Sequence, residues 1–259
     1  NRWIDGVDFE QARTTTPEGF PALPDLPGGR YWEPEFFALE HEALFKRGWL
    51  YAGHRDQLPN PGSFFVWRRT GTPIVIIRGV DHRIRAFYNT CRHRGAPVVR
   101  QEAGETGKFL SCGYHGWTYD TIGNLVDVPD PRDWSTLDRS CRGLVPVRCD
   151  MLGNWIFICE APDAPGLADF LAPVARFFRH LPLQDLRLVH QHTVEVRGNY
   201  KVVLENFLEA YHFRLLHRRT TDRIFDNLGT SIHLWDHGHS LMLSPNRRSD
   251  WVDPGTIGM

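Results

Sequence analysis

The sequence lacks any long apolar run. None of its hydrophobic stretches approaches the roughly 20 residues that a membrane-spanning helix needs. It also lacks an excess of charge of either sign, because 30 Lys and Arg face 31 Asp and Glu and leave a formal net charge of −1. A chain with so little net charge has no electrostatic signature of nucleic-acid or anionic-membrane binding. We therefore expect neither a nucleic acid nor a membrane as partner.

The sequence contains few cysteines, and their number is odd. The five cysteines are Cys91, Cys112, Cys141, Cys149 and Cys159. The first residues, NRWIDGVDFEQARTTT, lack the basic and then apolar pattern of a secretory signal. Cysteines in such a chain are typically thiols or metal ligands rather than disulfides. These features predict a cytoplasmic location, with Cys141, Cys149 and Cys159 as structural thiols.

What is present indicates a globular chain of two parts. Hydrophobic residues make up 41% and charged residues 24%, and the length allows one large or two ordinary domains. Residues 1–47 combine a Pro- and Gly-rich arm with a predicted helix over 34–47. Residues 48–160 consist of short β-rich runs separated by turn residues, which predicts an all-β module. Residues 161–259 mix helices, predicted over 166–181 and 200–217, with a strand over 186–198 and a hairpin over 232–243. The fold class is therefore α+β.

Two short motifs within the β module carry metal-binding side chains. They are Cys91-Arg92-His93 and Cys112-Gly113-Tyr114-His115. Thiolate and imidazole bind both iron and zinc. A zinc finger normally pairs Cys with Cys and His with His, whereas each motif here contains one of each. This arrangement favours two loop tips closing over a cluster, the Cys2His2 ligand set of a Rieske [2Fe–2S] centre. A zinc site and unrelated buried residues remain as alternatives.

The surrounding residues resemble the Rieske family, and the resemblance is to oxygenase large subunits. CRHRG, CGYHGWTYD and GNLV carry it. It implies that Cys91, His93, Cys112 and His115 bind a [2Fe–2S] cluster. Respiratory-type members carry an extra cysteine in each loop, where this sequence has Ala96 and Tyr114, so the bracing disulfide cannot form. Trp117 and Tyr119 are expected to pack against the second loop.

A second group of polar residues lies in LENFLEAYHFRLLH, residues 204–217. The apolar residues recur at three- and four-residue steps, which predicts an amphipathic helix with a buried stripe. His212 and His217 are five residues apart, about 140° around a regular helix. A metal shared by both would need a bulge or a helix end between them. Taken alone, the pair is more typical of two independent histidines.

Together with the Rieske motif, E-N-F-x-E-x-Y-H-x-x-x-x-H resembles the mononuclear iron motif of Rieske non-heme iron oxygenases. The resemblance implies that His212 and His217 bind Fe(II) and that Asn206 lies close to it. Glu209 would join His212 to a cluster histidine, His115, of a neighbouring subunit. Many members that act on aromatic rings have aspartate there, and a glutamate is similar to members that act on quaternary ammonium compounds.

The iron site of this family also has a carboxylate ligand, located far beyond the second histidine. Here Met259 follows His217 by only 42 residues. The aspartates that follow His217 do not match the family position; they are Asp222, Asp226, Asp236, Asp250 and Asp253. We therefore name no third ligand and expect a C-terminally truncated catalytic domain.

The resemblance implies a fold, an activity and partners. It predicts a Rieske domain over 48–160 and an incomplete helix-over-antiparallel-sheet (helix-grip, START-like) catalytic domain over 161–259. Residues 1–47 would form an arm and helix packing on the catalytic domain. The implied activity is that of an aromatic-ring-hydroxylating dioxygenase alpha subunit, which uses O2 and NAD(P)H-derived electrons to mono- or dioxygenate a small, aromatic substrate.

Expected partners are a reductase, with or without a ferredoxin, further copies in a homotrimer, and in some members a small beta subunit. Two alternatives remain. One is oxidative demethylation or hydroxylation of a quaternary ammonium compound within the same family. The other is a Rieske electron carrier with a non-catalytic extension.

Overall fold

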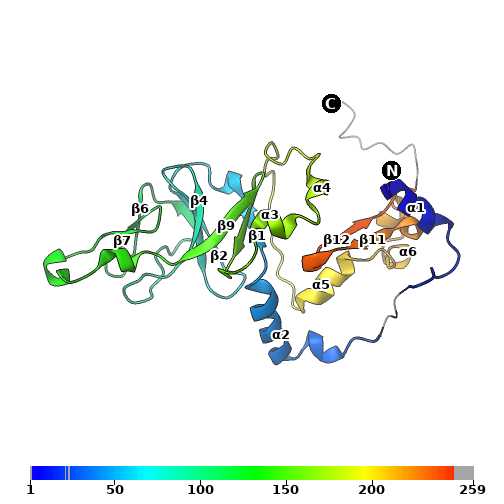
Figure 1. The fold of residues 1–259 in the computed structure, drawn as a ribbon, viewed down its shortest axis with the longest axis horizontal. Coiled ribbons are helices and arrows are strands. Elements are labelled where there is room, and N and C mark those ends of the chain that lie inside the picture. The colour runs from blue at the N-terminus through cyan, green and yellow to red at the C-terminus, as the bar shows by residue number, and fades with distance from the viewer. Residues whose placement is uncertain (1, 21, 23, 248–259) are drawn as a thin grey trace. The chain divides into compact units, whose positions relative to one another are not determined.

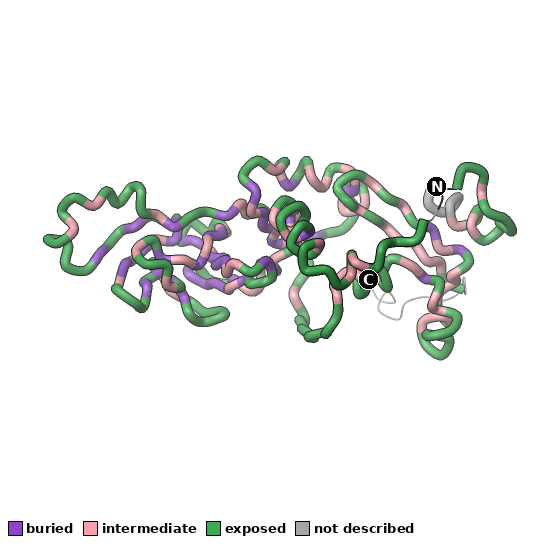
Figure 2. Tube along the Cα trace, turned by 90° about the horizontal axis from the view of Figure 1, so that it is seen from below, coloured by how far each residue is buried: buried purple, intermediate pink, exposed green. Residues whose placement is uncertain are grey.

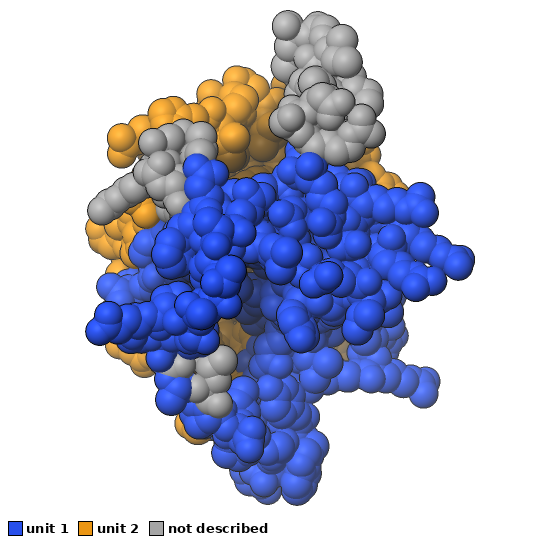
Figure 3. Space-filling model, turned by 90° about the vertical axis from the view of Figure 1, so that its right-hand side faces the viewer, with its two compact units in different colours: residues 1–36, 194–259 blue, residues 37–193 orange. Residues whose placement is uncertain are grey.

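The chain divides into two compact units. The computed structural model describes residues 2–20, 22 and 24–247. One unit, called the central unit below, is Phe37–Thr193, and the other, called the terminal unit, is Asn1–Phe36 with Val194–Met259 (Figure 3). No helix among the described residues is long and apolar enough to cross a membrane.

The central unit is built on a seven-stranded antiparallel sheet (Figure 1). Its strands, in spatial order, are β1 (Leu50–His54), β10 (Trp155–Cys159), β9 (Pro146–Leu152), β4 (Ile84–Tyr88), β3 (Ile74–Arg78), β2 (Ser63–Trp67) and β5 (Ala103–Glu105). A second sheet of three strands contains β6 (Phe109–Ser111), β7 (Thr118–Asp120) and β8 (Leu125–Asp127). The predicted all-β module is confirmed.

Strand β3 shows how the larger sheet is stabilised on both faces. Ile74 and Ile76 pack into one apolar cluster, and Val75 and Ile77 pack into another. The alternation follows from the two-residue repeat of a strand. All four side chains have 0% exposure, and burying each contributes roughly 1.5–3 kcal/mol. The second cluster also contains Cys91 and Cys112, so this core supports both metal-binding motifs.

Short helical segments complete the central unit, and the first of them begins in residues 34–36 of the terminal unit. The predicted helix over 34–47 is α2 (Pro34–Glu40), followed by a π-helical turn over His41–Phe45. The predicted helix over 166–181 is two short helices, α3 (Leu167–Leu171) and α4 (Ala175–Phe178). Pro173 lies between them, and proline cannot donate the backbone hydrogen bond that a continuous helix needs. Three 3-10 turns are η3 (Arg55–Gln57), η4 (Pro131–Trp134) and η5 (Arg139–Arg142).

The described part of the terminal unit contains the other helices and one hairpin. The helical segments are α1 (Arg2–Ala12), η1 (Gly28–Tyr31), α5 (Tyr200–Phe207), α6 (Phe213–Leu216), η6 (Thr221–Arg223), η7 (Asn227–Gly229) and η8 (Asp236–Gly238). The predicted hairpin is confirmed as β11 (Ser231–Leu234) and β12 (Ser240–Leu243), with Ser231 opposite Leu243. Figure 2 shows that buried residues concentrate in the central unit.

Two predictions for the C-terminal part are wrong. The segment 186–198 forms no strand, and Val189 is 94% exposed. A strand needs a neighbour for its backbone groups, and no described strand pairs with this segment. The predicted helix over 200–217 is interrupted between α5 and α6, and its apolar stripe is exposed: Phe207 by 71% and Leu215 by 86%.

Candidate metal centres

The first motif forms a tight loop that ends at a glycine. The Gly95 N–H donates to the Cys91 carbonyl at 3.0 Å, and the Cys91 N–H donates to the Ala96 carbonyl at 2.8 Å. Gly95 has φ of 74°, a left-handed conformation in which glycine has no steric cost. The loop therefore reverses the chain within five residues, with Cys91 at its base.

The second motif has the same backbone closure. The Gly116 N–H donates to the Cys112 carbonyl, and the Cys112 N–H donates to the Trp117 carbonyl, both at 2.9 Å. Gly116 has φ of 71°, and a Cβ there would lie 2.8 Å from Cγ of Pro129. The two cysteines thus occupy equivalent positions in two equivalent loops. The histidine follows its cysteine by two residues in the first loop and by three in the second.

Both cysteine side chains lie in the apolar core. Cys91 is 4% exposed and Cys112 is 2% exposed. The Tyr119 hydroxyl lies 3.3 Å from Sγ of Cys91 and accepts the Arg92 N–H at 3.0 Å. Burial raises the pKa of the Cys91 thiol, and the neighbouring Cys112 raises it further, although the Tyr119 hydroxyl and the His93 backbone oppose the shift. Two adjacent buried thiols ionise together only beside a strong positive charge, which a bound metal provides.

The two histidines of the motifs meet edge to face. Their ring centroids are 4.6 Å apart, and the rings of His93 and Trp117 stack at 4.9 Å with an interplanar angle of 8°. Nδ1 of His93 is buried and has no hydrogen-bond partner among the described residues. Burial, with His115 and Arg94 nearby, lowers the pKa of His93 and favours the neutral ring that can bind a metal.

These residues fit a [2Fe–2S] cluster of the Rieske type. That cluster takes two thiolates on one iron and two imidazoles on the other. The two buried thiols and the unpartnered Nδ1 of His93 match this donor set. Within the described residues, no three His, Cys, Asp or Glu side chains are grouped to hold a single metal ion. A Rieske cluster needs only two protein ligands for each iron.

Packing around the loops was only partly predictable. Trp117 and Tyr119 are buried at 3% and 0% exposure, and their side-chain contacts reach the first loop: Trp117 stacks on His93, and the Tyr119 hydroxyl lies 3.3 Å from Sγ of Cys91. Their expected packing against the second loop stays a prediction. Trp134 was missed. Its ring contacts His93 edge-on at 5.5 Å and Trp117 at 5.5 Å. Trp134 lies in η4, outside both motifs, and a lone tryptophan after β8 gives no sequence signal of this contact.

The second histidine pair flanks a single helical turn in the terminal unit. Helix α5 ends at Phe207, and α6 begins at Phe213, so His212 and His217 lie at the N-terminal and C-terminal ends of α6. Their ring centroids are 5.1 Å apart. The five-residue spacing of the two histidines requires a departure from a regular helix, and both residues do lie at helix ends.

Glu209 holds His212 in one orientation. Its carboxylate contacts Nδ1 of His212 and also accepts the His212 backbone N–H at 3.2 Å. Burial raises the pKa of Glu209, but hydrogen bonds from the His212 ring and from the backbone of His212 and Tyr211 outweigh it, so that pKa is lowered overall. An ionised carboxylate only accepts, so Nδ1 of the His212 ring carries a proton, and in the neutral ring the lone pair is then on Nε2.

Among the described residues, no carboxylate or cysteine joins these histidines in a group of three that could hold a metal ion. Asn206 is exposed on α5. Asp222 pairs with Arg247 at 2.6 Å, and the Asp226 carboxylate lies 3.6 Å from the same guanidinium. Asp236 begins η8. Asp250 and Asp253 lie outside the described residues.

Helix α5 is attached to the N-terminal segment. The Tyr31 hydroxyl lies 2.9 Å from both carboxylate oxygens of Glu205, and that hydrogen bond raises the pKa of Tyr31. Asn199 caps α5 by accepting the Lys201 N–H at 2.9 Å, and its amide donates to the Tyr31 carbonyl at 3.0 Å. The sequence did not predict the contact between Tyr31 and Glu205.

Two family models match the chain. Residues 48–149 match the Rieske [2Fe-2S] domain, and residues 183–259 match the catalytic domain of the ring hydroxylating alpha subunit.

Three curated relatives are between 31% and 36% identical in sequence to this chain. The glycine betaine monooxygenase oxygenase subunit of Pseudomonas aeruginosa (strain UCBPP-PA14) is 32% identical over 72% of this chain and 43% of the relative. The carnitine monooxygenase oxygenase subunit of Escherichia coli (strain K12) is 31% identical over 80% and 57%. The large oxygenase component of 2,4-dinitrotoluene dioxygenase from Burkholderia sp. (strain RASC) is 36% identical over 72% and 43%. The chain thus spans about half the length of these relatives.

Solved structures of Rieske oxygenases are also similar to this chain. A quaternary ammonium Rieske monooxygenase in complex with L-carnitine superposes with a TM-score of 0.76 at 28% identity, covering 90% of this chain and 67% of that chain. Naphthalene 1,2-dioxygenase with indole bound superposes with a TM-score of 0.66 at 33% identity, covering 73% and 43%.

Proposed function

The chain belongs to the family of Rieske oxygenase alpha subunits, and we propose that it acts in the terminal oxygenase component of such an enzyme. The reaction would use O2 and NAD(P)H-derived electrons to mono- or dioxygenate a small organic, aromatic substrate. The observation that carries this proposal is the presence of two separate donor sets in one chain. One is the Cys2His2 set with its unpartnered, buried His93 Nδ1, and the other is the His212–His217 pair.

Each donor set has a proposed occupant. Cys91, Cys112, His93 and His115 would hold the [2Fe–2S] cluster. His212 and His217 would hold the mononuclear Fe(II), with Asn206 nearby. When bound, the cluster provides one-electron transfer and the iron provides O2 activation. The protein residues bind both groups and set the orientation of their imidazoles.

Glu209 is proposed to orient the iron ligand and to join the two centres across a subunit boundary. Its contact with Nδ1 of His212 directs Nε2 of that ring toward the metal. The Glu209 side chain is 39% exposed, so part of the carboxylate is accessible to a further partner. That partner would be His115 of the partner subunit in a cyclic homotrimer.

The domain division that we propose follows the metal sites. Residues 48–160 would form the Rieske domain, 161–259 the catalytic domain, and 1–47 an arm and helix on the catalytic domain. Contacts of the N-terminal segment support the role of the arm. Tyr31 bonds Glu205 on α5, and the Gln11 amide donates to the Asp226 carboxylate at 3.1 Å.

A quaternary ammonium compound is the second candidate substrate. Two observations favour it: relatives named as glycine betaine and carnitine monooxygenases, and a glutamate at position 209. Similarity to proteins named as 2,4-dinitrotoluene dioxygenase and naphthalene 1,2-dioxygenase supports an aromatic substrate as the first candidate. A reductase, with or without a ferredoxin, is proposed as electron donor, a beta subunit as a further partner, and the cytoplasm as location.

The first test is metal and sulfide content with the visible spectrum before and after dithionite. We expect about three irons and two sulfides per chain, with a spectrum that bleaches on reduction. His217→Ala should lower the iron content to about two without changing the spectrum. Two irons in the wild type after Fe(II) addition, with no O2 uptake, would instead indicate an electron carrier. Zinc with no visible absorbance would refute the Rieske assignment.

Substrate class is tested by O2 consumption with a reductase present. Glycine betaine and carnitine represent one class, and naphthalene and a nitrotoluene represent the other. The class whose hydroxylated or demethylated product forms in step with O2 uptake identifies the substrate.

A further inference from the structure

Three arginines from separate parts of the central unit line one cavity of about 580 Å³. Arg55 begins η3, Arg78 ends β3, and Arg187 lies in the segment after α4. None of the proposed cluster ligands lines this cavity. The volume is within the range of pockets that bind small molecules, roughly 300–1,000 Å³.

Two of these arginines have unused hydrogen-bonding capacity. The Arg55 guanidinium makes no ion pair or side-chain hydrogen bond with a described residue. Arg78 donates to the Leu58 and Pro59 carbonyls at 3.2 and 2.6 Å and lies 3.3 Å from Nδ1 of His82, but its Nε is buried without a partner. A buried donor without an acceptor is destabilising, because its lost hydration is not replaced.

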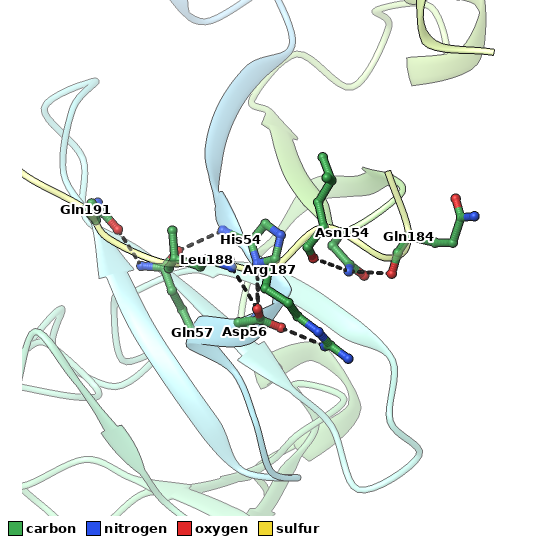
Figure 4. Close-up of polar contacts among 9 residues, drawn as sticks. His54, Asp56, Gln57, Asn154, Gln184, Arg187, Leu188 and Gln191 are labelled. Atoms are coloured by element: carbon green, nitrogen blue, oxygen red, sulfur yellow. Dashed lines mark hydrogen bonds and ion pairs between the residues drawn. The ribbon is translucent and has the colours of Figure 1, made fainter. Parts of the chain in front are cut away.

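Asp56 is the single carboxylate among the lining residues, and its oxygens are already engaged. One accepts the Leu188 N–H at 2.9 Å, and the other lies 3.5 Å from Nη1 of Arg187 (Figure 4). Nδ1 of the buried His54 ring lies 3.6 Å from the same carboxylate. Asp56 therefore offsets one of three positive charges and leaves the cavity with an excess of two.

From this arrangement we propose that the cavity binds a small dianion that carries phosphate or carboxylate oxygens. The guanidinium fork matches both groups, and charge-assisted hydrogen bonds of this kind are about twice as strong as neutral ones. Arg55 and Arg187 are the residues that contact the ligand, and Arg78 adds its remaining N–H. The excess of two charges selects a dianion over a monoanion.

Binding would also fasten a segment of the chain. Asn154 donates to the Gln184 and Leu186 carbonyls at 2.8 and 3.1 Å, and Gln57 donates to Gln191 at 3.1 Å (Figure 4). These contacts hold residues 184–191 against η3 and the β9–β10 turn. An anion between Arg55 and Arg187 would add a bridge between the same two parts.

The experiment is calorimetric titration of the chain with inorganic phosphate, malonate and acetate at pH 7.5 and constant ionic strength. We expect saturable binding of phosphate or malonate, and at least tenfold weaker binding of acetate. Tighter phosphate binding would identify a phosphate group as the ligand, and tighter malonate binding a dicarboxylate. Amide exchange at Leu188 should slow in the presence of the tighter dianion.

Three variants make the result specific. Arg55→Gln and Arg187→Gln should each weaken dianion binding by about tenfold, the loss expected for one charge-assisted hydrogen bond. Arg132→Gln is the matched control, because its side chain is 85% exposed and does not line the cavity. Circular dichroism checks that each variant is folded. The proposal is overturned if the wild type shows no saturable binding, or if both pocket variants bind like Arg132→Gln. Neither result depends on oxygenase activity.

Discussion

The carboxylate of Glu209 contacts Nδ1 of His212, three residues later, in the segment where α5 has ended and α6 begins. Side chains three residues apart are neighbours on a helix, and the interruption adds a backbone N–H that the same carboxylate can accept. Glu209 also accepts the backbone N–H of His212, so one carboxylate fixes both the main chain and the ring of a proposed iron ligand. A neutral side chain at position 209 would leave His212 in place but would no longer fix the orientation of its ring.

Glu209→Gln should therefore retain the visible spectrum and, at saturating Fe(II), nearly all of the iron, while turnover falls by on the order of 100-fold. The amide keeps the size of the side chain but no longer fixes the Nδ1–H tautomer. Glu205→Gln is the matched control, because Glu205 lies on the same segment and bonds Tyr31 instead. Turnover of Glu209→Gln equal to that of the control would refute the role of Glu209.

Tyr119→Phe should lower the reduction potential of the cluster. The Tyr119 hydroxyl lies 3.3 Å from Sγ of Cys91, and a hydrogen bond to a ligand sulfur stabilises the more negative, reduced cluster. Its loss costs about 1 kcal/mol, or about 40 mV for a one-electron couple. Redox titration followed by visible absorbance measures the shift.

Tyr114→Phe is the control for that measurement. Tyr114 is 57% exposed, its ring lies beside His115, and its hydroxyl makes no hydrogen bond to a described cysteine. Equal potentials in Tyr119→Phe and wild type would show that the hydroxyl does not act on the cluster.

The β module and its metal motifs were predictable because both depend on local pattern. The apolar alternation along β3 and the two Cys-to-Gly loops are each encoded within a few residues. The stacking of Trp117 on His93 and the edge contact of Trp134 depend on how the loop after β4, the β6–β7 loop and η4 meet, which local sequence does not specify. The Tyr31–Glu205 bond joins residues 174 positions apart and was missed for the same reason.

The errors in residues 186–217 have a different cause. The alternation of Val194 and Val196 is a correct pattern for a strand, but a strand forms only where another strand pairs with it. The stripe from Leu204 to Leu215 has helical spacing, yet the described structure leaves it exposed and interrupts the helix at Leu208. Hydrophobic periodicity shows which secondary structure a segment favours, but a neighbouring strand or core must be present for that structure to form.

Gly116→Ala should impair cluster binding more than Gly95→Ala. Both glycines have positive φ, so alanine costs about 1–2 kcal/mol at either position. At Gly116 the new Cβ would also lie 2.8 Å from Cγ of Pro129, whereas nothing lies within 4 Å at Gly95. We expect a lower thermal midpoint for Gly116→Ala and visible absorbance reduced by half or more. Equal occupancy in the two variants would contradict the steric argument.

The attachment of residues 184–191 should weaken in acid. The Leu188 N–H, the nearby His54 and Arg187 lower the pKa of Asp56, so the folded state favours the ionised carboxyl. The contribution of Asp56 is therefore fully present above its ordinary pKa, about 3.9, and is lost as the pH falls through the lower pKa of the folded state. Amide exchange at Leu188, corrected for the intrinsic rate, should show constant protection from pH 7 to 5 and a several-fold loss below pH 4. Asp56→Asn should show weaker protection without this pH dependence, whereas Asp150→Asn, at a carboxylate that accepts the Met151 N–H and does not line this cavity, should behave as wild type. The same acid-induced loss in Asp56→Asn would assign the effect to another group.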